Sequence, residues 1–161
     1  MSEPPEPEGI FLSVLNEDPR GWEVRVATTL VRFHSRLERR MAEVLGTHGL
    51  SSPQFDVLAT LWHGEGITQQ ELAERLLVTK GNVVGILNRI SAAGWVERRP
   101  DPEDRRANRL FLTAEGRNLV EKALPCQMAL GKRIFGTLTE AELRQMDSML
   151  ERLEKACRSH S

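Results

Sequence analysis

From about residue 22 onward, the apolar residues of this chain recur every three or four positions, except between residues 95 and 112. Such spacing places apolar side chains on one face of an α-helix. In the exceptional stretch, short β-type runs at 95–96 and 110–112 flank Pro100 and Pro102, and a helix cannot continue through these prolines. Two β-type arms around a turn make a hairpin. The sequence therefore predicts a mostly α fold with a small β-hairpin.

Several of the predicted helices begin at side chains that can satisfy free backbone N–H groups. Ser51, Thr68 and Thr139 are each followed three residues later by Gln or Glu, which is the pattern of a capping box. Thr113 begins a long helix, which Pro125 should kink or split. The expected helices span residues 22–46, 51–63, 68–77, 79–93, 113–135 and 139–158.

Two apolar stripes at the ends of the chain predict a homodimer. One runs along the first long helix, and the other forms a coiled-coil-like seam on the last helix. A single chain of this size would leave both stripes in water, which is unfavourable. The stripes consist of Val26, Leu30, Phe33, Leu37, Met41 and Val44, and of Leu143, Met146, Leu150, Leu153 and Cys157.

The expected organisation has four segments. Residues 1–9 are acidic and rich in proline, with too few apolar side chains to offset the entropy of ordering, and form a flexible tail. Residues 10–48 contain an N-terminal helix that contributes to dimerisation. Residues 50–112 form a compact unit of short helices and the hairpin. Residues 113–158 form the C-terminal dimerisation helices.

The composition excludes several classes of protein. No apolar run approaches the roughly 18 residues that a membrane span requires. An acidic N-terminus does not fit a secretory signal, so we expect a cytoplasmic protein. The chain has no phosphate-cradling Gly-rich loop and no nucleophile motif, so we expect no enzyme. The four histidines are scattered without metal-ligand spacing, so we expect no metal and no other cofactor.

The two cysteines, Cys126 and Cys157, are far apart and fit no disulfide framework. We interpret both as small core or interface residues, because free cysteine usually behaves in this way. A peroxide-sensing thiol is the alternative that remains open.

The order of elements after residue 68 is that of a winged helix-turn-helix. A short helix, a tight turn at residues 77–78 and a second helix are followed by a basic hairpin. The net charge of the chain is only −1, but residues 79–112 hold seven basic and four acidic side chains. A second helix of this kind fits the major groove of DNA, and arginines on the hairpin can contact the adjacent backbone or minor groove.

The most specific part of the sequence is Asp101-Pro102-Glu103-Asp104-Arg105-Arg106, followed by Leu112-Thr113-Ala114-Glu115-Gly116-Arg117. Together with residues 72–76, 83–90 and 94–98, this stretch resembles the MarR family (multiple antibiotic resistance regulators). The resemblance spans roughly residues 23–158. It implies a winged helix-turn-helix that binds a pseudo-palindromic operator in double-stranded DNA, usually as a repressor, with the first and last two helices forming a homodimer.

The resemblance also implies roles for individual residues. Asp104 would support the wing by pairing with an arginine, while Arg105 or Arg106 enters the minor groove. Where many members have Thr-Arg on the recognition helix, this chain has Val84-Gly85. The full set of expected DNA-binding residues is Gln69, Thr79, Lys80, Asn82, Val84, Arg89, Arg98, Arg105 and Arg106.

A small-molecule effector, often an aromatic acid in this family, is a further implied partner. Phe33, His34, Trp62 and His63 are candidates to line its pocket, although core packing would explain them as well. Two alternatives stay open: a winged-helix adaptor that binds proteins rather than DNA, and a redox- or metal-sensing member of the same family. The arginines of the hairpin favour DNA binding over the adaptor.

Overall fold

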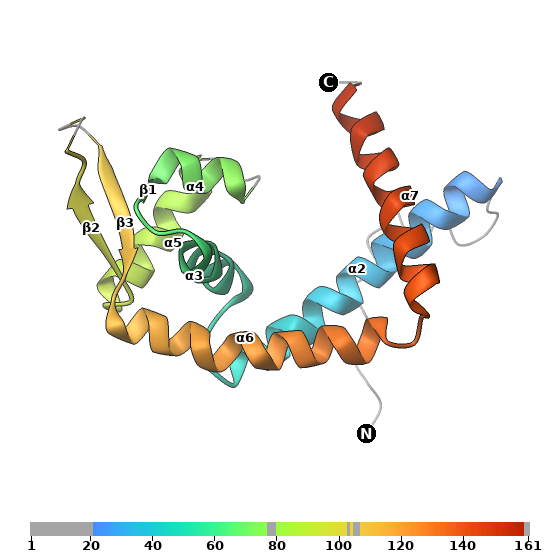
Figure 1. Cartoon of the computed structure of the whole chain (residues 1–161), viewed down its shortest axis with the longest axis horizontal. Coiled ribbons are helices and arrows are strands. Elements are labelled where there is room, and N and C mark those ends of the chain that lie inside the picture. Colours follow the sequence, from blue (N-terminus) through green and yellow to red (C-terminus); the bar gives the residue numbers. More distant parts are fainter. Residues whose placement is uncertain (1–20, 77–79, 103, 105–106, 160–161) are drawn as a thin grey trace. The chain divides into compact units, whose positions relative to one another are not determined.

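The computed structural model describes residues 21–76, 80–102, 104 and 107–159 (Figure 1). The predicted tail at residues 1–9 lies outside this part. The chain divides into two compact units, Met1–Glu43 and Val44–Ser161. In the described residues, no helix is both long and apolar enough to cross a membrane.

The first unit contains most of helix α2, Trp22–Gly46, which has the bounds that the apolar spacing predicts. Three residues of its apolar stripe are exposed: Val26 at 53%, Leu30 at 42% and Phe33 at 38%. The last turn of α2 belongs to the second unit, where Leu45 is buried in the core. The stripe is therefore exposed in the first half of the helix, while Leu37, Met41 and Val44 are half-buried.

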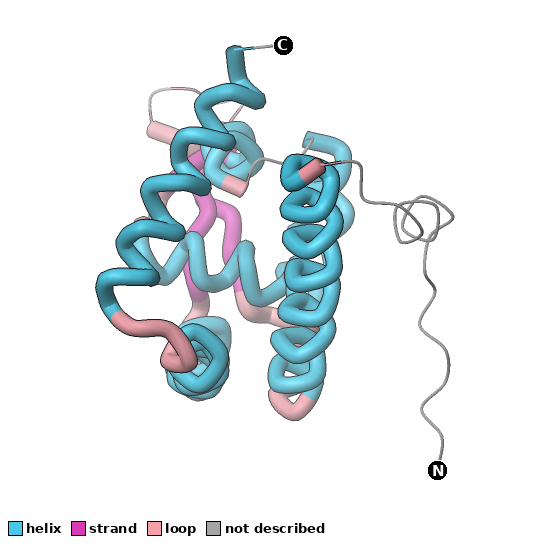
Figure 2. Tube along the Cα trace, turned by 90° about the vertical axis from the view of Figure 1, so that its right-hand side faces the viewer, coloured by secondary structure: helices cyan, strands magenta, loops and turns pink. Residues whose placement is uncertain are grey.

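The second unit contains a winged helix-turn-helix, as expected. Its sheet, magenta in Figure 2, has the strand order β1-β3-β2, and both pairings are antiparallel. Strand β1 is too short to show a β pattern, and the sequence analysis missed it. The elements are α3 Ser52–His63, β1 Ile67–Thr68, α4 Gln69–Arg75, α5 Lys80–Ala92, β2 Val96–Pro100 and β3 Asn108–Leu112.

One hydrophobic core joins these elements. It takes Leu58 and Leu61 from α3, Leu72 from α4, Leu110 from β3 and Val120 from the following helix, all at most 1% exposed. Each such side chain stabilises the fold by roughly 1.5–3 kcal/mol through removal of apolar surface from water. The helices and the sheet are thereby fixed as one unit.

Helix α6, Ala114–Phe135, runs through Pro125 as one continuous helix (Figure 1). Of the prediction that Pro125 should kink or split this helix, the split is wrong, and the kink stays a prediction. Proline cannot donate to the carbonyl of Glu121, but both residues lie on the exposed face of the helix, where water can satisfy that carbonyl. The buried face, with Val120 and Ala123 in the core, continues without interruption.

Helix α7, Glu140–Ser159, has no buried residue. Its start is fixed by Glu142, whose Oε2 accepts hydrogen bonds from Thr139 N and Oγ1, both at 2.7 Å. Leu150 and Leu153 of the predicted seam are exposed, at 39% and 52%. Cys157 on the same helix is also exposed, as is Cys126 on α6, so the prediction of core cysteines was wrong. Their alternative place, at an interface, stays a prediction.

Candidate nucleic-acid interface

Helix α4 begins with a complete capping box. The Glu71 carboxylate accepts from Thr68 N at 2.7 Å, and Glu71 N donates to Thr68 Oγ1 at 3.2 Å. The hydrogen bond from the Thr68 backbone is the main cause that lowers the pKa of Glu71 from its usual value of 4.5. The first helix of the helix-turn-helix is thus fixed at its start by local interactions.

Helix α5, the recognition helix of the motif, has a buried face and an exposed face. Val83, Leu87 and Ile90 are fully buried, so the helix cannot rotate about its axis without losing core contacts. The opposite face carries Val84, 39% exposed, and Gly85. A side chain at Gly85 would meet no other atom within 4 Å, so packing in the described chain does not require glycine there.

The expected base-reading residues lie mainly at the start of this helix. Thr79 lies outside the described residues. Lys80 and Asn82 belong to the first turn of α5, but their side chains lie outside the description. Arg89, near the other end of the helix, is exposed. Their roles stay predictions.

Arg98 on strand β2 connects the wing to the recognition helix. Its Nη2 donates to Asn88 Oδ1 at 2.8 Å, and Asn88 lies on the exposed face of α5. Arg98 also lines an open cavity of about 450 Å³ between the start of α4 and the wing. Three residues of the sequence prediction, Gln69, Arg98 and Asp104, meet there, together with Thr68, Gln70, Ala107, Asn108 and Leu110.

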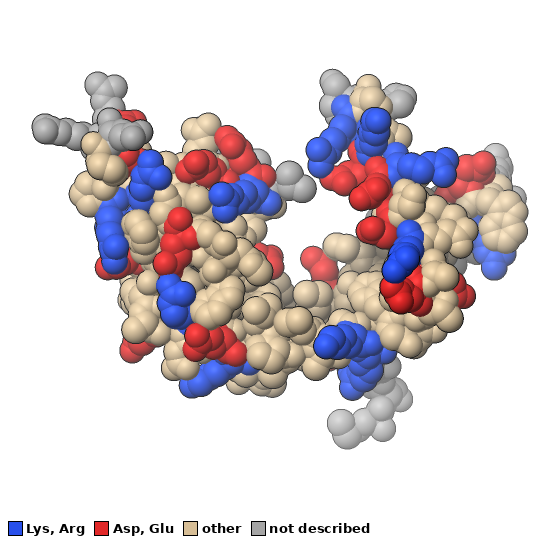
Figure 3. Space-filling model, in the orientation of Figure 1, with Lys and Arg blue, Asp and Glu red and all other residues tan. Residues whose placement is uncertain are grey.

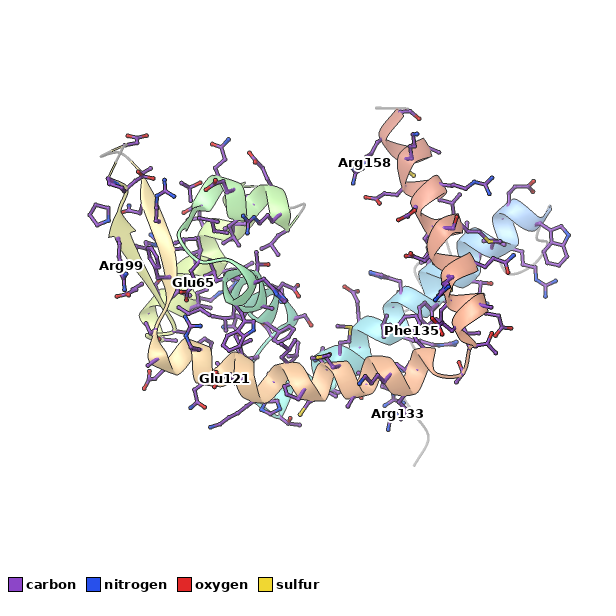
Figure 4. The ribbon with its side chains drawn as sticks, viewed as in Figure 1. Glu65, Arg99, Glu121, Arg133, Phe135 and Arg158 are labelled. Carbon is purple, nitrogen blue, oxygen red and sulfur yellow. The ribbon has the colours of Figure 1, made fainter. Side chains whose placement is uncertain are left out.

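The other face of the wing carries two arginines in directly opposed positions. Arg99 on β2 pairs with Arg109 on β3 in the sheet register. Their charges would repel if both side chains projected in the same direction. Arg99 instead lies over the Phe111 ring, 4.3 Å from its centroid, and bonds to Glu97 (Figure 4).

The side chain of Arg109 contacts two groups away from Arg99. Its Nε lies 2.7 Å from Asp101 Oδ2, and its Nη1 donates to the carbonyl of Gly66 at 2.9 Å. Asp101 is nearly buried, with 5% of its side chain exposed, and its Oδ1 accepts from Asp104 N at 3.3 Å. The sequence analysis assigned wing support to Asp104 and missed this pair. The available signal was an aspartate between two prolines, a typical turn residue.

The predicted tip residues Arg105 and Arg106 lie outside the described residues. The segments on either side of them are joined by two backbone hydrogen bonds. Ala107 N donates to Asp104 O at 2.9 Å, and Asp101 N donates to Ala107 O at 3.0 Å. The described base of the tip is therefore held at a fixed width.

The segment after the wing fastens the sheet to α6. Glu65 Oε1 accepts from Leu112 N at 3.0 Å and from Arg117 Nη2 at 2.6 Å (Figure 4). Thr113 Oγ1 accepts from Gly116 N at 3.0 Å and donates to the carbonyl of Gly94 at 2.6 Å. The Leu-Thr-x-x-Gly-Arg motif that carries the family resemblance thus has a structural role at the base of the wing.

The four expected effector-pocket residues are divided between the two units. Trp62 is half-buried on α3, under the guanidinium of Arg117 at 5.4 Å from the ring centroid, and His63 is exposed. Phe33 and His34 lie on α2, where His34 Nδ1 is 3.6 Å from Glu38 Oε2. That these four residues line one effector pocket stays a prediction.

The surface of the wing is mixed in charge. On the face shown in Figure 3, both basic and acidic side chains lie over the wing strands. No group of three or more His, Cys, Asp or Glu side chains suited to a metal ion occurs among the described residues.

Known proteins resemble this chain in both sequence and fold. The family model for the MarR family matches residues 48–107. An HTH-type transcriptional regulator of Bacillus cereus strain ATCC 10987 is 31% identical over 127 residues, covering 78% of this chain and 84% of that protein. The apo crystal structure of MarR from E. coli is 28% identical, with a TM-score of 0.66, and the match covers 78% of this chain and 94% of that one.

A further solved structure is CouR from Rhodococcus jostii RHA1, bound to p-coumaroyl-CoA. It is 25% identical, with a TM-score of 0.72, and the match covers 86% of this chain and 93% of that one. The mostly helical fold with a small antiparallel sheet agrees with these winged-helix structures, which confirms the predicted fold class. The chain belongs to the MarR family of helix-turn-helix transcription regulators.

Proposed function

We propose that this regulator binds a pseudo-palindromic operator as a homodimer, represses transcription there, and leaves the operator when a small effector binds. In this proposal helix α5 enters the major groove and the wing contacts the adjacent minor groove. The observation that carries it is the arrangement around α5: its buried face is fixed by the core, while Asn88 on its exposed face binds Arg98 of the wing. Recognition helix and wing are therefore presented together.

The dimer is supported by the two exposed apolar stripes. On α7, none of the residues is buried within the chain, and Leu150 and Leu153 remain exposed. Val26 and Leu30 on α2 are exposed as well. Apolar surface of this extent is typical of an interface between protein chains.

The effector is supported by the relatives. CouR, which has the same fold, holds p-coumaroyl-CoA in its crystal structure. An aromatic acid or its thioester is therefore the first class of effector to test against this protein. Phe33, His34, Trp62 and His63 remain the candidates to contact it.

The experiment that tests DNA binding is a selection of bound sequences from random duplex DNA. A palindromic consensus with two half-sites about one helical turn apart is expected. Binding of the selected duplex is measured by fluorescence anisotropy. The logarithm of the binding constant should fall linearly with the logarithm of the salt concentration, because binding releases cations from the phosphates that the protein neutralises.

Failure to enrich any sequence would contradict the proposed function. In that case capture of a protein partner by the same winged domain, the adaptor alternative, would become the better explanation. If a sequence is enriched, addition of candidate aromatic acids to the complex with the selected duplex tests release, which should appear as a loss of anisotropy.

A further inference from the structure

The Asp101–Arg109 pair lies where the wing meets the rest of the winged domain. Arg109 is on the central strand β3, which pairs with both β1 and β2. Its guanidinium contacts Asp101, the first residue after β2, through Nε, and the carbonyl of Gly66, the residue before β1, through Nη1. One side chain therefore joins both arms of the hairpin to the residue before β1, which lies 43 positions earlier in the sequence.

The chemistry of this contact constrains its geometry. The side chain of Asp101 is 5% exposed, and a carboxylate removed from water is strongly destabilising unless it is paired and hydrogen-bonded. Oδ2 meets Arg109, while Oδ1 accepts from the backbone N–H of Asp104 at 3.3 Å. A change in the angle between the wing and β1 would pull the Arg109 side chain away from either Asp101 or the carbonyl of Gly66.

Asp104 is the last described residue before the arginines of the wing tip. Its backbone is held on both sides, by Asp101 through the N–H and by Ala107 through the carbonyl at 2.9 Å. Gly66, at the other end of the connection, is followed by β1 and then by α4 of the helix-turn-helix. The pair thus connects the base of the wing tip with the start of the helix-turn-helix.

We propose that Asp101 and Arg109 are positioning residues that set the orientation of the wing tip relative to the recognition helix. Neither side chain contacts DNA in this assignment. The inference rests on the proposed function, because the orientation matters only if wing and recognition helix bind the same duplex. It gives Asp101 a wing-supporting role of its own, while the role that the family resemblance implies for Asp104 stays a prediction.

The test compares Asp101→Asn and Arg109→Gln with the wild type, both singly and combined, against the selected duplex over a salt series. Each single variant should lose roughly tenfold in affinity, as expected for loss of one buried ion pair. The double variant should bind DNA no less tightly than the single variant that has the lower affinity, because both substitutions act through one contact. The slope of log affinity against log salt should stay unchanged, because no phosphate contact is lost.

The direction in which Asp101→Asn changes the affinity for DNA decides between a positioning role and a purely electrostatic effect. A purely electrostatic effect would strengthen binding, because the variant removes a negative charge from the DNA-facing domain. Tighter or unchanged binding of Asp101→Asn would therefore overturn the proposal. So would a salt slope reduced by about 1 in Arg109→Gln, because that would make Arg109 a direct phosphate contact.

A second measurement is independent of DNA and of the proposed function. Hydrogen exchange of the free protein over residues 96–112 should be faster in both single variants. Arg109→Lys, which can keep a charge beside Asp101, should recover part of the protection. The matched control is Arg99→Gln, which removes the same charge from the opposed position and should leave exchange at the tip unchanged. Unchanged exchange in Asp101→Asn would reject the positioning role even if no DNA ligand were found.

Discussion

Replacement of Gly116 by alanine is expected to destabilise the protein, although alanine is the better helix former. Gly116 lies in the first turn of α6, where the helix passes against the backbone of Trp95. A Cβ at this position would lie 2.0 Å from Trp95 O and 2.9 Å from Trp95 C. Both are backbone atoms, so no side chain can rotate away to make room.

The magnitude follows from what must move. A carbon–oxygen contact needs about 3.3 Å, so the helix start and the Trp95 carbonyl must separate by more than about 1 Å. That shift would weaken the bonds from Thr113 N to Trp95 O, 3.1 Å, and from Thr113 Oγ1 to Gly94 O, 2.6 Å. Two such bonds at about 1 kcal/mol each and roughly 1–3 kcal/mol of overpacking, less about 1 kcal/mol of helix propensity, give a net loss of about 2–4 kcal/mol.

The assay is urea unfolding followed by circular dichroism, at one fixed protein concentration because association would shift the midpoint. The matched control is Gly131→Ala in the same helix, where a Cβ would meet nothing within 4 Å. That variant should gain up to about 1 kcal/mol. If Gly116→Ala unfolds at the same or a higher urea concentration than the wild type, the close approach to Trp95 does not constrain this position.

The remaining predictions concern DNA binding, pH and assembly. Arg106→Ala should weaken binding to all duplexes and lower the salt slope by about 1, with unchanged melting temperature; an unaltered slope would remove it from the contact surface. Asn82→Ala should relax the preference at one base position per half-site, which a repeated selection would detect, whereas Lys80→Ala should lower affinity for all sequences equally. The pKa of Glu71 is lowered from its usual value of 4.5, so the ionised carboxylate stabilises the fold at a pH above 4.5. This contribution is lost as the pH falls through the folded-state pKa. The stability difference between wild type and Glu71→Gln should therefore shrink in acid, and a constant difference would contradict the capping role. Sedimentation at micromolar concentration should give about twice the mass of one chain, and a monomer there would weaken the operator model.

Much of the fold was determined by local sequence patterns. The three-to-four spacing of apolar residues gave α2 its observed bounds, Trp22–Gly46, because a helix that buries one face requires this spacing. The capping pairs placed the starts of α3, α4 and α7 correctly, because their hydrogen bonds join residues only three apart. The hairpin followed from Pro100 and Pro102, which exclude a helix by themselves.

Contacts between distant segments were decided only by the tertiary structure. Strand β1 has two residues and exists because Ile67 and Thr68 find partners on β3, more than forty positions later. The ion pair of Asp101 and Arg109 depends on the register of the hairpin, and no local pattern indicates that Asp101 pairs with Arg109.

The Leu-Thr-x-x-Gly-Arg motif after the wing also combines features that the sequence shows with a feature that only the packing explains. Its residue types in the sequence resemble the family, but only the packing of α6 against Trp95 explains why position 116 is glycine. In the same way, Pro125 signals a break by itself, whereas the continuous buried face of Val120 and Ala123 keeps α6 in one piece. Local preferences amount to about 1 kcal/mol per residue, rising to about 3 for proline, and a packed core of many buried side chains can outweigh them.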